Sequence, residues 1–566
     1  MCGIVGYVGA QQAAPILLEG LQKLEYRGYD SAGIAVLDGS TIELAKACGE
    51  IKNLLAKTHD GSDLHGYIGL GHTRWATHGA PTEANAHPHV SNDGKFAIVQ
   101  NGIIENFMEL REMLQAKGFR FHSETDTEVI VHLLDMYYTG DGNLKDTVMK
   151  TLGRLEGSYA IGILCADCPD QMFLARNGCP LIIGVGAGEN FFASDVTALV
   201  SHTKNVVYLD DGELAEVRAD GYTVFDCTGK PVHKPVSRVA WDIEAAEKGG
   251  YEHFMLKEIM EQPRAIKSTL DPRVKDHRVV FDELKMTDAQ LMGFNKIMIT
   301  ACGSACYAGQ AGKYALEKLT HIPVDADLAS EFRYRDPIVD EHTLMIIISQ
   351  SGETADTIAA IREAQSKGAY VLSIVNVVGS TIARISDDVI YTWAGPEIAV
   401  ATTKGYTTQV SVLYLLALYL GEKRGCLSRE EAAKLTDDLM ILPQMVQRAI
   451  DLNPQIAQLA ERYKNNPSLF FIGRNVDYAV CMEGSLKLKE ISYLHSEAYA
   501  AGELKHGTIA LIEENRLVIA VACYEPLFDK TMSNPAALQD TLFYVPSAGW
   551  EVHKFIILKS FIVLSS

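Results

Sequence analysis

TLMIIISQSGETADTIAAIREA, residues 343–364, decides the fold of the second half of this chain. An apolar run of strand length passes directly into a helix-favouring segment, a unit typical of a parallel sheet covered by helices. Four polar side chains lie at the junction: Ser349, Gln350, Ser351 and Thr354. Free N–H groups, the helix dipole and short hydroxyls make such a junction suitable for phosphate, with an ordinary N-cap as the alternative. A dinucleotide fingerprint and a Walker loop are both missing from this stretch.

Two further stretches repeat the order of apolar strand, glycine-containing loop or turn, and helix. They are KIMITACGSACYAGQAGKYALEKL (296–319) and SLFFIGRNVDYAVCMEGSLKLKEI (468–491). Residues 432–452 between them have the apolar spacing of a helix. We therefore expect a weak internal repeat, with two lobes of similar fold joined by a helical connection.

The first 238 residues have a different pattern of apolar runs and turns. Strand-like runs such as FAIVQ (96–100) and YAIGILC (159–165) are separated by Gly, Asn and Asp turns, which favours stacked antiparallel sheets with few long helices. A charged, helix-favouring stretch follows from about residue 239. With 566 residues in all, the chain should fold as three compact units.

Composition restricts the partners. The net charge of −21 disfavours a broad nucleic-acid surface, so an anionic ligand must sit in a local pocket and the partner should be a small molecule. The start lacks a basic leader, and no window reaches the roughly 20 apolar residues of a membrane span. Eleven cysteines without a framework spacing suit reduced thiols, so we expect a cytoplasmic enzyme.

The amino terminus carries a candidate nucleophile, Cys2. Removal of Met1 would leave thiol and α-amine on one residue, and the amine can then act as the base for the thiol. Taken alone, a cysteine at this position is often incidental. GLGHTRWATHGAP (69–81) adds Arg74 in a segment with the texture of a loop, and an arginine can grip a carboxylate through two parallel hydrogen bonds.

Two more segments complete a possible amide-hydrolysing site. FAIVQNGIIEN ends an apolar run at Asn101 and Gly102, whose amide groups would suit an oxyanion, although Asn-Gly also predicts a hairpin turn. In SETDTEVIVHLL (123–134), Asp126 could hold a substrate ammonium. Alternatively, Thr125 and Glu128 form a capping box and Asp126 only favours the helix dipole.

Five segments in this order resemble the glutaminase domain of the glutamine–fructose-6-phosphate aminotransferase family. They are C-G-I-V-G, Y-R-G-Y-D-S-A-G (26–33), G-H-T-R-W-A-T-H-G, N-G-I-I-E-N and S-E-T-D-T-E. The resemblance implies an N-terminal-nucleophile fold in which Cys2 attacks the glutamine amide. It also implies these roles: Arg74 and Asp126 bind the ends of glutamine, Asn101 and Gly102 form the oxyanion hole, Thr77 and His78 line the pocket, Trp75 gates an ammonia passage, and Arg27 lies in a closing segment.

A metal site is the alternative for the histidines of this region. His72, His78, His87 and His89 lie close in sequence, but their spacings do not place them on one face of a single helix or strand. The pair Cys165 and Cys168 lacks the second pair that a zinc site would need. We therefore expect no metal and no organic cofactor.

A second charged cluster lies late in the chain. Glu483, Lys487 and Glu490 are spaced at i, i+4 and i+7 and share one helix face. An exposed ion-pair ladder is the ordinary explanation. Alternatively, Lys487 beside Glu490 could tune an acid–base pair that moves a proton next to a carbonyl.

This half resembles the sugar isomerase (SIS) domain pair of the same family, through S-Q-S-G-E-T-A-D-T, T-T-K-G-Y-T-T-Q (402–409) and L-K-L-K-E-I-S-Y with G-E-L-K-H-G. The resemblance implies that the sugar phosphate is held by Ser349, Gln350, Ser351 and Thr354, and that the sugar is contacted by Cys302, Gly303, Ser304 and the backbone near Val400. It also implies that Glu490 shuttles a proton between C1 and C2, with Lys487 nearby. In the same family, the residue matching His506 opens the sugar ring from a neighbouring subunit, and the resemblance implies this role for His506. A homodimer follows from the last role.

Two departures from the family are visible. Ala305 stands where the family has a serine in its C-G-T-S loop. After about Asn534 the sequence departs from the family and contains no match to the family's closing L-A-K-S-V-T-V-E segment. In the family, the lysine of that segment forms a Schiff base with the ketose. Lys554 and Lys559 lie in no matching motif. A frameshift, a truncated gene and a genuine variant would all give this sequence.

We therefore predict an α/β multidomain chain: an α/β/β/α glutaminase sandwich (1–238), a linker (239–250), a first SIS lobe of α/β/α type (251–430) and a second SIS lobe (431–566), divergent or incomplete from about 535. The predicted activity converts glutamine and fructose 6-phosphate to glutamate and glucosamine 6-phosphate, the first step of amino-sugar synthesis. The alternative is a glutaminase, or a sugar-phosphate sensor, with an impaired synthase site.

Overall fold

The computed structural model describes residues 2–25, 28–76, 79–140, 143–239, 248–512 and 516–532, and the backbone of 542–544. The chain divides into two compact units, Met1–Ala246 and Glu247–Ser566. Several sequence predictions fall outside the described residues: most of the predicted linker 239–250, Arg27, Thr77, His78, Lys554 and Lys559.

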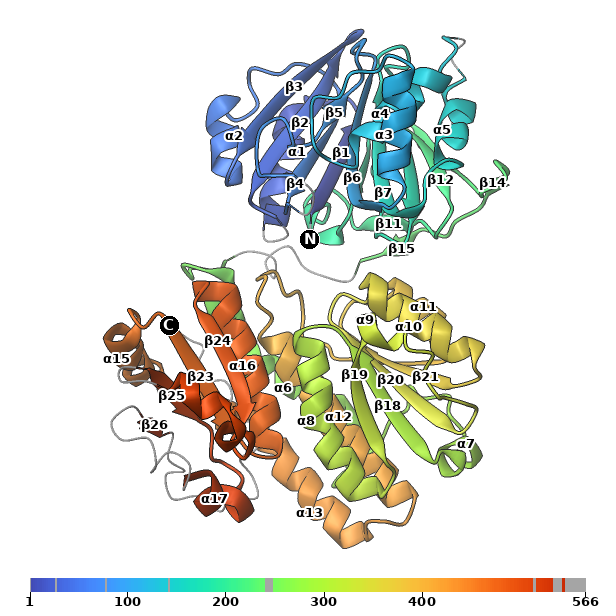
Figure 1. Ribbon diagram of the computed structural model, residues 1–566. Helices are drawn as coiled ribbons and strands as arrows, with labels where there is room; N and C mark the ends of the chain where they lie inside the picture. The colour runs from blue at the N-terminus through green and yellow to red at the C-terminus, as the bar shows by residue number, and fades with distance from the viewer. Residues whose placement is uncertain are drawn as a thin grey trace. The chain divides into compact units, whose positions relative to one another are not determined.

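The first unit contains two antiparallel sheets (Figure 1). The first sheet has the order β15 (Ser237–Arg238), β11 (Asn205–Tyr208), β9 (Ile182–Val185), β10 (Asn190–Ala193), β1 (Gly3–Val8), β4 (Ile68–Arg74), β2 (Ser31–Asp38), β3 (Thr41–Cys48). The second has the order β14 (Pro231–Val232), β13 (Gly221–Phe225), β12 (Leu214–Arg218), β8 (Gln171–Asn177), β7 (Gly157–Cys165), β6 (Phe96–Ile104), β5 (His89–Val90).

The two sheets pack face to face, with helices on their outer faces. Strand β1 shows the alternation: Ile4 and Val8 pack between the sheets, whereas Val5 and Tyr7 pack under the helices. Helices α1 (Ala13–Leu24) and α2 (Ile51–Lys57) cover the first sheet, and α3 (Phe107–Ala116), α4 (Glu128–Tyr137) and α5 (Leu144–Leu152) cover the second. This arrangement confirms the predicted α/β/β/α sandwich.

The second unit begins with a five-stranded parallel sheet. Its order is β19 (Val324–Leu328), β18 (Lys296–Ala301), β20 (Thr343–Ser349), β21 (Tyr370–Val375), β22 (Asp388–Tyr391). Ile346 and Ile348 of β20 pack under α8 (Ser304–Thr320) and α12 (Lys404–Lys423), while Met345 and Ile347 pack under α10 (Ala355–Ser366). Because both faces are covered, β20 is apolar at every position from Leu344 to Ile348, as its sequence predicted.

A second lobe carries a four-stranded sheet of order β24 (His495–Ala500), β23 (Ser468–Gly473), β25 (Leu517–Ala520), β26 (Leu542–Tyr544), in which every pairing is parallel. Helix α16 (Val476–Ser492) follows β23 as α8 follows β18. The residues before the two helices, Gly303 and Asn475, have φ of 57° and 56°, and the residues after them, His321 and Tyr493, are both left-handed. The predicted internal repeat is therefore confirmed in the backbone.

The remaining helices connect and cover these sheets: α6 (Phe254–Leu270), α7 (Asp288–Gly293), α9 (Ala329–Phe332), α11 (Thr381–Ile385), α13 (Arg429–Met440), α14 (Leu442–Ile450), α15 (Asn453–Tyr463) and α17 (Phe528–Met532), together with the hairpin β16 (Val274–Lys275) and β17 (Arg278–Val279). Helices α13 and α14 occupy the stretch predicted to connect the lobes, and α14 packs against α6. Within the described residues, no helix is long and apolar enough to cross a membrane.

Candidate active sites

The first candidate site lies around Cys2, which directly precedes β1 in the first sheet. Strand β4 pairs with β1 so that Thr73 lies opposite Gly3, which brings the end of β4 next to Cys2. The backbone N–H of Trp75 donates to Cys2 Sγ at 3.3 Å, and the thiol lies 3.5 Å from the carbonyl oxygen of Trp75. Burial raises the pKa of the Cys2 thiol, so the resting sulfur is protonated and needs a base before it can attack.

Arg74 is the last residue of β4, which corrects the prediction that this segment is a loop. The glycines of GLGHTRW obscured the strand. A Cβ on Gly69 would lie 2.8 Å from Leu17, and one on Gly71 would lie 3.0 Å from Leu21. Helix α1 therefore packs too closely for side chains at these two strand positions.

Asn101 and Gly102 lie inside strand β6, so the hairpin-turn alternative is wrong. Asn101 pairs with Ala160 and Gly102 with Tyr159 across the sheet. The Asn101 side chain reaches the first sheet, where Nδ2 donates to the carbonyl oxygen of Cys2 at 3.1 Å. Gly102 has φ of 110°, and a Cβ there would meet the Ser158 carbonyl oxygen at 2.1 Å, so only glycine fits.

Arg74 and Asp126 are the residues predicted to bind the two ends of glutamine. The Arg74 guanidinium donates to the carbonyl oxygens of Gly79 and Ala80 at 3.2 and 3.3 Å. Burial lowers the pKa of the Arg74 guanidinium, and the nearby Cys2, Asp30 and Asp126 oppose this shift. The structure therefore brings Cys2, Arg74 and Asp126 into one neighbourhood.

Asp126 lies before α4 rather than in its first turn, which corrects the helix-dipole alternative. Helix α4 begins at Glu128 and has no side-chain N-cap, so the predicted capping box of Thr125 and Glu128 is not formed. Asp126 Oδ2 instead accepts from the N–H of Ile104 at 2.8 Å. Glu128 folds back and accepts from the N–H groups of His122 and Ser123, both at 2.7 Å.

Three histidines of the region form a buried stack beside Asn101. The His72 and His87 rings are stacked with centroids 4.2 Å apart, and His89 packs edge-on against His87 at 4.7 Å. His72 Nε2 lies 3.0 Å from Asn101 Oδ1, a contact that the sequence pattern did not predict. Among the described residues no three His, Cys, Asp or Glu side chains gather as a metal site, and His78 lies outside them.

Trp75, the predicted gate, is 39% exposed and packs edge-on against Tyr29 with ring centroids 5.2 Å apart. The predicted pocket residues Thr77 and His78 follow it directly and lie outside the described residues.

The second candidate site lies at the carboxyl ends of β18 and β20. Ser349 Oγ accepts from the N–H of Gly352 at 3.0 Å and lies 3.2 Å from Thr354 Oγ1. Ser351 Oγ accepts from the N–H of Glu353 at 3.2 Å. Thr354 precedes α10 but its side chain caps no backbone N–H, so the ordinary N-cap alternative is wrong and the hydroxyls gather before an uncapped helix start.

The loop after β18 lies beside this junction and also touches the second lobe. Cys302 Sγ is 3.7 Å from Thr357 Oγ1 on α10. Gly303, with φ of 57°, turns the chain into α8, and Ser304 Oγ donates to Glu483 Oε1 on α16 at 2.8 Å. Ser304 therefore joins the two lobes at this site.

The charged face of α16 is buried, so the exposed-ladder alternative is wrong. Glu483 is 4% and Lys487 1% exposed. Lys487 Nζ donates to Glu490 Oε2 and lies 3.6 Å from Glu483 Oε1. Burial raises the pKa of Glu483 to about 8. Glu490 is partly exposed.

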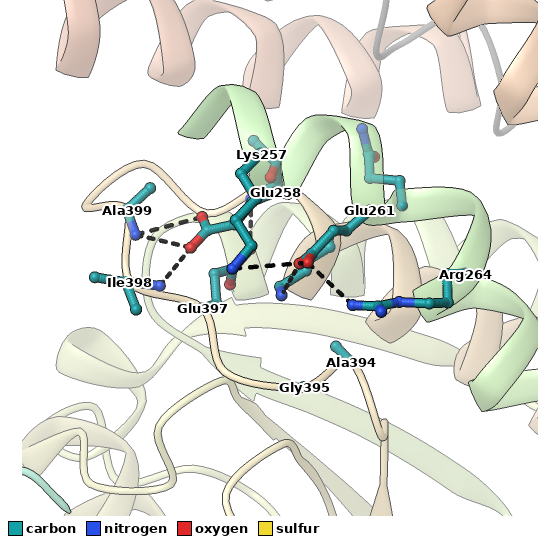
Figure 2. A network of polar contacts seen from close by, with 12 residues as sticks. Lys257, Glu258, Glu261, Arg264, Ala394, Gly395, Glu397, Ile398 and Ala399 are labelled. Carbon is teal, nitrogen blue, oxygen red and sulfur yellow. Dashed lines mark hydrogen bonds and ion pairs between the residues drawn. The ribbon is translucent and has the colours of Figure 1, made fainter. Parts of the chain in front are cut away.

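Two predicted residues do not join this cluster through side-chain contacts. His506 is exposed at the end of the short helix η5 (Glu503–His506), and among the described residues its side chain makes no hydrogen bond or ion pair. Val400 is 56% exposed in the connection between β22 and α12. The N–H groups of Ile398 and Ala399, just before it, point at a buried carboxylate on α6 (Figure 2).

Comparison with known proteins supports two domain types. Residues 50–240 match the glutamine amidotransferase domain, and residues 290–419 and 463–540 match the SIS domain. The chain is 53% identical to a glutamine–fructose-6-phosphate aminotransferase (isomerizing) of Clostridium tetani, over 94% of this chain and 88% of the relative. It is 47% identical to that of Thermus thermophilus, over 94% and 87%.

A solved structure gives the same result for the second unit. The C-terminal domain of glucosamine-fructose-6-phosphate aminotransferase from Francisella tularensis matches with a TM-score of 0.54 and 35% identity, over 56% of this chain and 96% of that domain.

An amino-terminal cysteine at the seam of an α/β/β/α sandwich, followed by paired SIS lobes, defines a glutamine amidotransferase linked to sugar isomerase domains. Within that class, the chain belongs to the glutamine–fructose-6-phosphate aminotransferase (isomerizing) family.

Proposed function

We propose that this chain transfers the amide nitrogen of glutamine to fructose 6-phosphate, giving glutamate and glucosamine 6-phosphate. The observation that carries the proposal is the placement of Asn101, whose Nδ2 lies 3.1 Å from the Cys2 carbonyl oxygen. An amide donor from the second sheet thus lies beside the residue that carries the nucleophile, where it can serve the oxyanion formed in attack on a carboxamide.

In the glutaminase half, Cys2 attacks the side-chain amide of glutamine, and its own α-amine, once Met1 is removed, accepts the thiol proton. The Asn101 amide and the backbone of Gly102 stabilise the tetrahedral oxyanion. Arg74 binds the substrate carboxylate and Asp126 its ammonium. Trp75 gates the ammonia, while Thr77 and His78 complete the pocket.

In the sugar half, the phosphate binds at the hydroxyls that precede α10, namely Ser349, Ser351 and Thr354, with Gln350 between them. The contact of the buried Lys487 with Glu490 supports proton transfer between C1 and C2 by Glu490, because a fixed cation holds that carboxylate in one position. Cys302, Gly303, Ser304 and Val400 surround the sugar.

His506 has no partner side chain within the described part of its own chain, which is consistent with a role in the site of a second copy. We therefore propose a homodimer in which His506 opens the sugar ring of the neighbouring site. The proposed location is the cytoplasm. The scheme uses groups of the protein itself and calls for no metal or organic cofactor.

A second candidate function is glutamine hydrolysis alone, with the SIS lobes only binding a sugar phosphate. The observation that favours it is that residues 535–566 contain no match to the family's lysine segment. Both functions predict hydrolysis of glutamine, so only the second product separates them.

The deciding experiment supplies purified protein with glutamine and fructose 6-phosphate and measures glutamate and glucosamine 6-phosphate separately. Both products are expected from the unmodified chain, and glutamate without amino sugar would establish hydrolysis alone. Cys2→Ala should abolish both products, whereas Cys227→Ala, which removes an exposed thiol, should retain both. Activity of the Cys2→Ala protein would overturn the nucleophile assignment.

A further inference from the structure

The connection between β22 and α12 is held by the carboxyl group of a residue outside the parallel sheet. Glu258, on α6, is 2% exposed. Its Oε1 accepts from the N–H of Ile398 at 2.5 Å and from the N–H of Ala399 at 3.1 Å (Figure 2). Both donors directly precede Val400, so Glu258 determines the direction in which the backbone enters that residue.

A second carboxylate, which belongs to this segment, binds the residues that follow Val400. Glu397 accepts from the Thr402 hydroxyl at 2.5 Å, the N–H of Thr403 at 2.8 Å and the N–H of Gly405 at 2.9 Å. It thereby satisfies N–H groups at the start of α12 that have no partner inside the helix. The chain on the carboxyl side of Val400 is fixed by this ring of hydrogen bonds.

The other end of the segment is tied to the proposed phosphate loop. Asn376, after β21, donates to the carbonyl oxygen of Gly395 at 2.7 Å and accepts from the N–H of Ala394 at 2.9 Å. The N–H of Asn376 itself donates to the carbonyl oxygen of Gln350 at 3.2 Å. The segment around Val400 and the loop of Ser349 to Thr354 are therefore both hydrogen-bonded to Asn376.

Helix α6 supplies a further carboxylate one turn later. Glu261 Oε2 accepts from Lys404 Nζ at 2.7 Å. Glu261 Oε1 lies 3.0 Å from Arg264 Nη2 and 4.0 Å from Lys257 Nζ (Figure 2). Lys404 begins α12 and is 2% exposed, where a cation is unfavourable at the positive end of the helix dipole. Glu261 compensates that charge, so α6 holds both the segment and the helix that follows it.

This arrangement exceeds what a surface loop needs for stability. A buried carboxyl group is costly unless it is hydrogen-bonded, and the buried Glu258 and the half-buried Glu397 leave only Val400 and Ala401 of residues 398–403 outside their hydrogen bonds. Resting on the function proposed above, we propose that Glu258 is a positioning residue for the sugar phosphate: through Ile398 and Ala399 it holds the backbone of Val400 in the orientation that contacts the sugar.

The test compares Glu258→Ala, Glu258→Gln and the control Glu252→Gln, which alters an exposed carboxylate just before α6. The KM for fructose 6-phosphate of Glu258→Ala should rise roughly five- to tenfold, the size of a lost hydrogen bond, with a smaller change in kcat. Glu258→Gln keeps one acceptor oxygen and should recover part of the loss. Glu252→Gln should match the unmodified chain.

Fructose 6-phosphate binding, measured by calorimetry without glutamine, keeps the two proposals separate. If the unmodified chain binds the sugar phosphate but makes no amino sugar, the proposed synthase function fails, and the affinity of the variants still tests Glu258. A folded Glu258→Ala protein with unchanged affinity and KM would overturn the inference. Should the alanine variant not fold, unchanged affinity in a folded Glu258→Gln protein together with an unchanged KM would also overturn it.

Discussion

His72 Nε2 lies 3.0 Å from Oδ1 of Asn101 and 3.1 Å from the carbonyl oxygen of Gln100. Both partners are acceptors, so the network assigns the ring proton to Nε2. Burial lowers the pKa of His72 to about 3, and the ring is therefore neutral at every pH at which the enzyme would work. By fixing Oδ1, His72 turns the Nδ2 group of Asn101 toward Cys2.

Replacing His72 should therefore impair glutamine hydrolysis without touching the substrate. His72→Leu removes the donor, and kcat for glutamate release should fall by up to about 10²-fold, the effect of losing one oxyanion donor. His72→Gln retains an N–H donor and should lose less. The pH profile of either variant should keep the ionisations of the unmodified chain between pH 5 and 8, because the native ring is already neutral there. Equal activity of His72→Leu and the unmodified chain would contradict the orientation argument.

Gly102→Ala should abolish glutaminase activity and lower stability. The residue has φ of 110°, and its added Cβ would lie 2.1 Å from the Ser158 carbonyl oxygen, which is backbone and cannot move aside. Strain of this kind costs about 1–3 kcal/mol before the clash is counted. Gly94→Ala is the matched control, because Gly94 also has positive φ, 77°, but has open space around it. Thermal unfolding of both variants, followed with glutamate release, separates the clash from the strain.

The sequence predicted the parts of this fold that depend on periodicity. β20 is apolar from Leu344 to Ile348 because helices cover both faces, and the strand, loop and helix of residues 296–319 recur at 468–491 because each lobe is built on the same unit. Patterns of this kind are local, so one sequence suffices to see them.

Contacts between distant segments were not predictable in this way. His72 was one of four histidines with no helical or strand spacing, and its partner Asn101 comes from the other sheet. The strand that carries His72 was obscured by glycines that are needed because α1 packs on them. Glu258 lies in a helix of ordinary amphipathic composition, and only the tertiary fold brings Ile398 to it. Resemblance to a family supplied the roles of Cys2 and Glu490, which spacing alone left open.

Glu490→Gln should separate the two halves of the reaction. Lys487 stays paired with Glu483, 3.6 Å away, so α16 should remain folded, but the group proposed to move the proton is lost. Formation of glucosamine 6-phosphate should fall by about 10²- to 10⁴-fold, the usual contribution of a general acid–base. Lys489→Gln, an exposed change on the same helix, is the control. Glutamate measured in the same reaction reports whether the glutaminase half is intact, and full amino-sugar synthesis by Glu490→Gln would remove this residue from the mechanism.

The buried carboxyl of Glu258 should make the stability of the second unit depend on pH. Burial, reinforced by the nearby charge of Glu397, raises the pKa of Glu258 to about 8, against an ordinary value of about 4.3. Between these values the folded chain binds a proton that the unfolded chain has lost, so the free energy of unfolding decreases as pH rises from about 4 to 8.

Glu258→Gln removes this ionisation. The difference in melting temperature between Glu258→Gln and the unmodified chain should therefore shift in favour of the variant as pH rises through this window and level off above it. Calorimetric melts at several pH values test this, with Glu252→Gln as the exposed control. A difference that is constant from pH 5 to 8 would show that the carboxyl of Glu258 is ionised in the folded chain throughout.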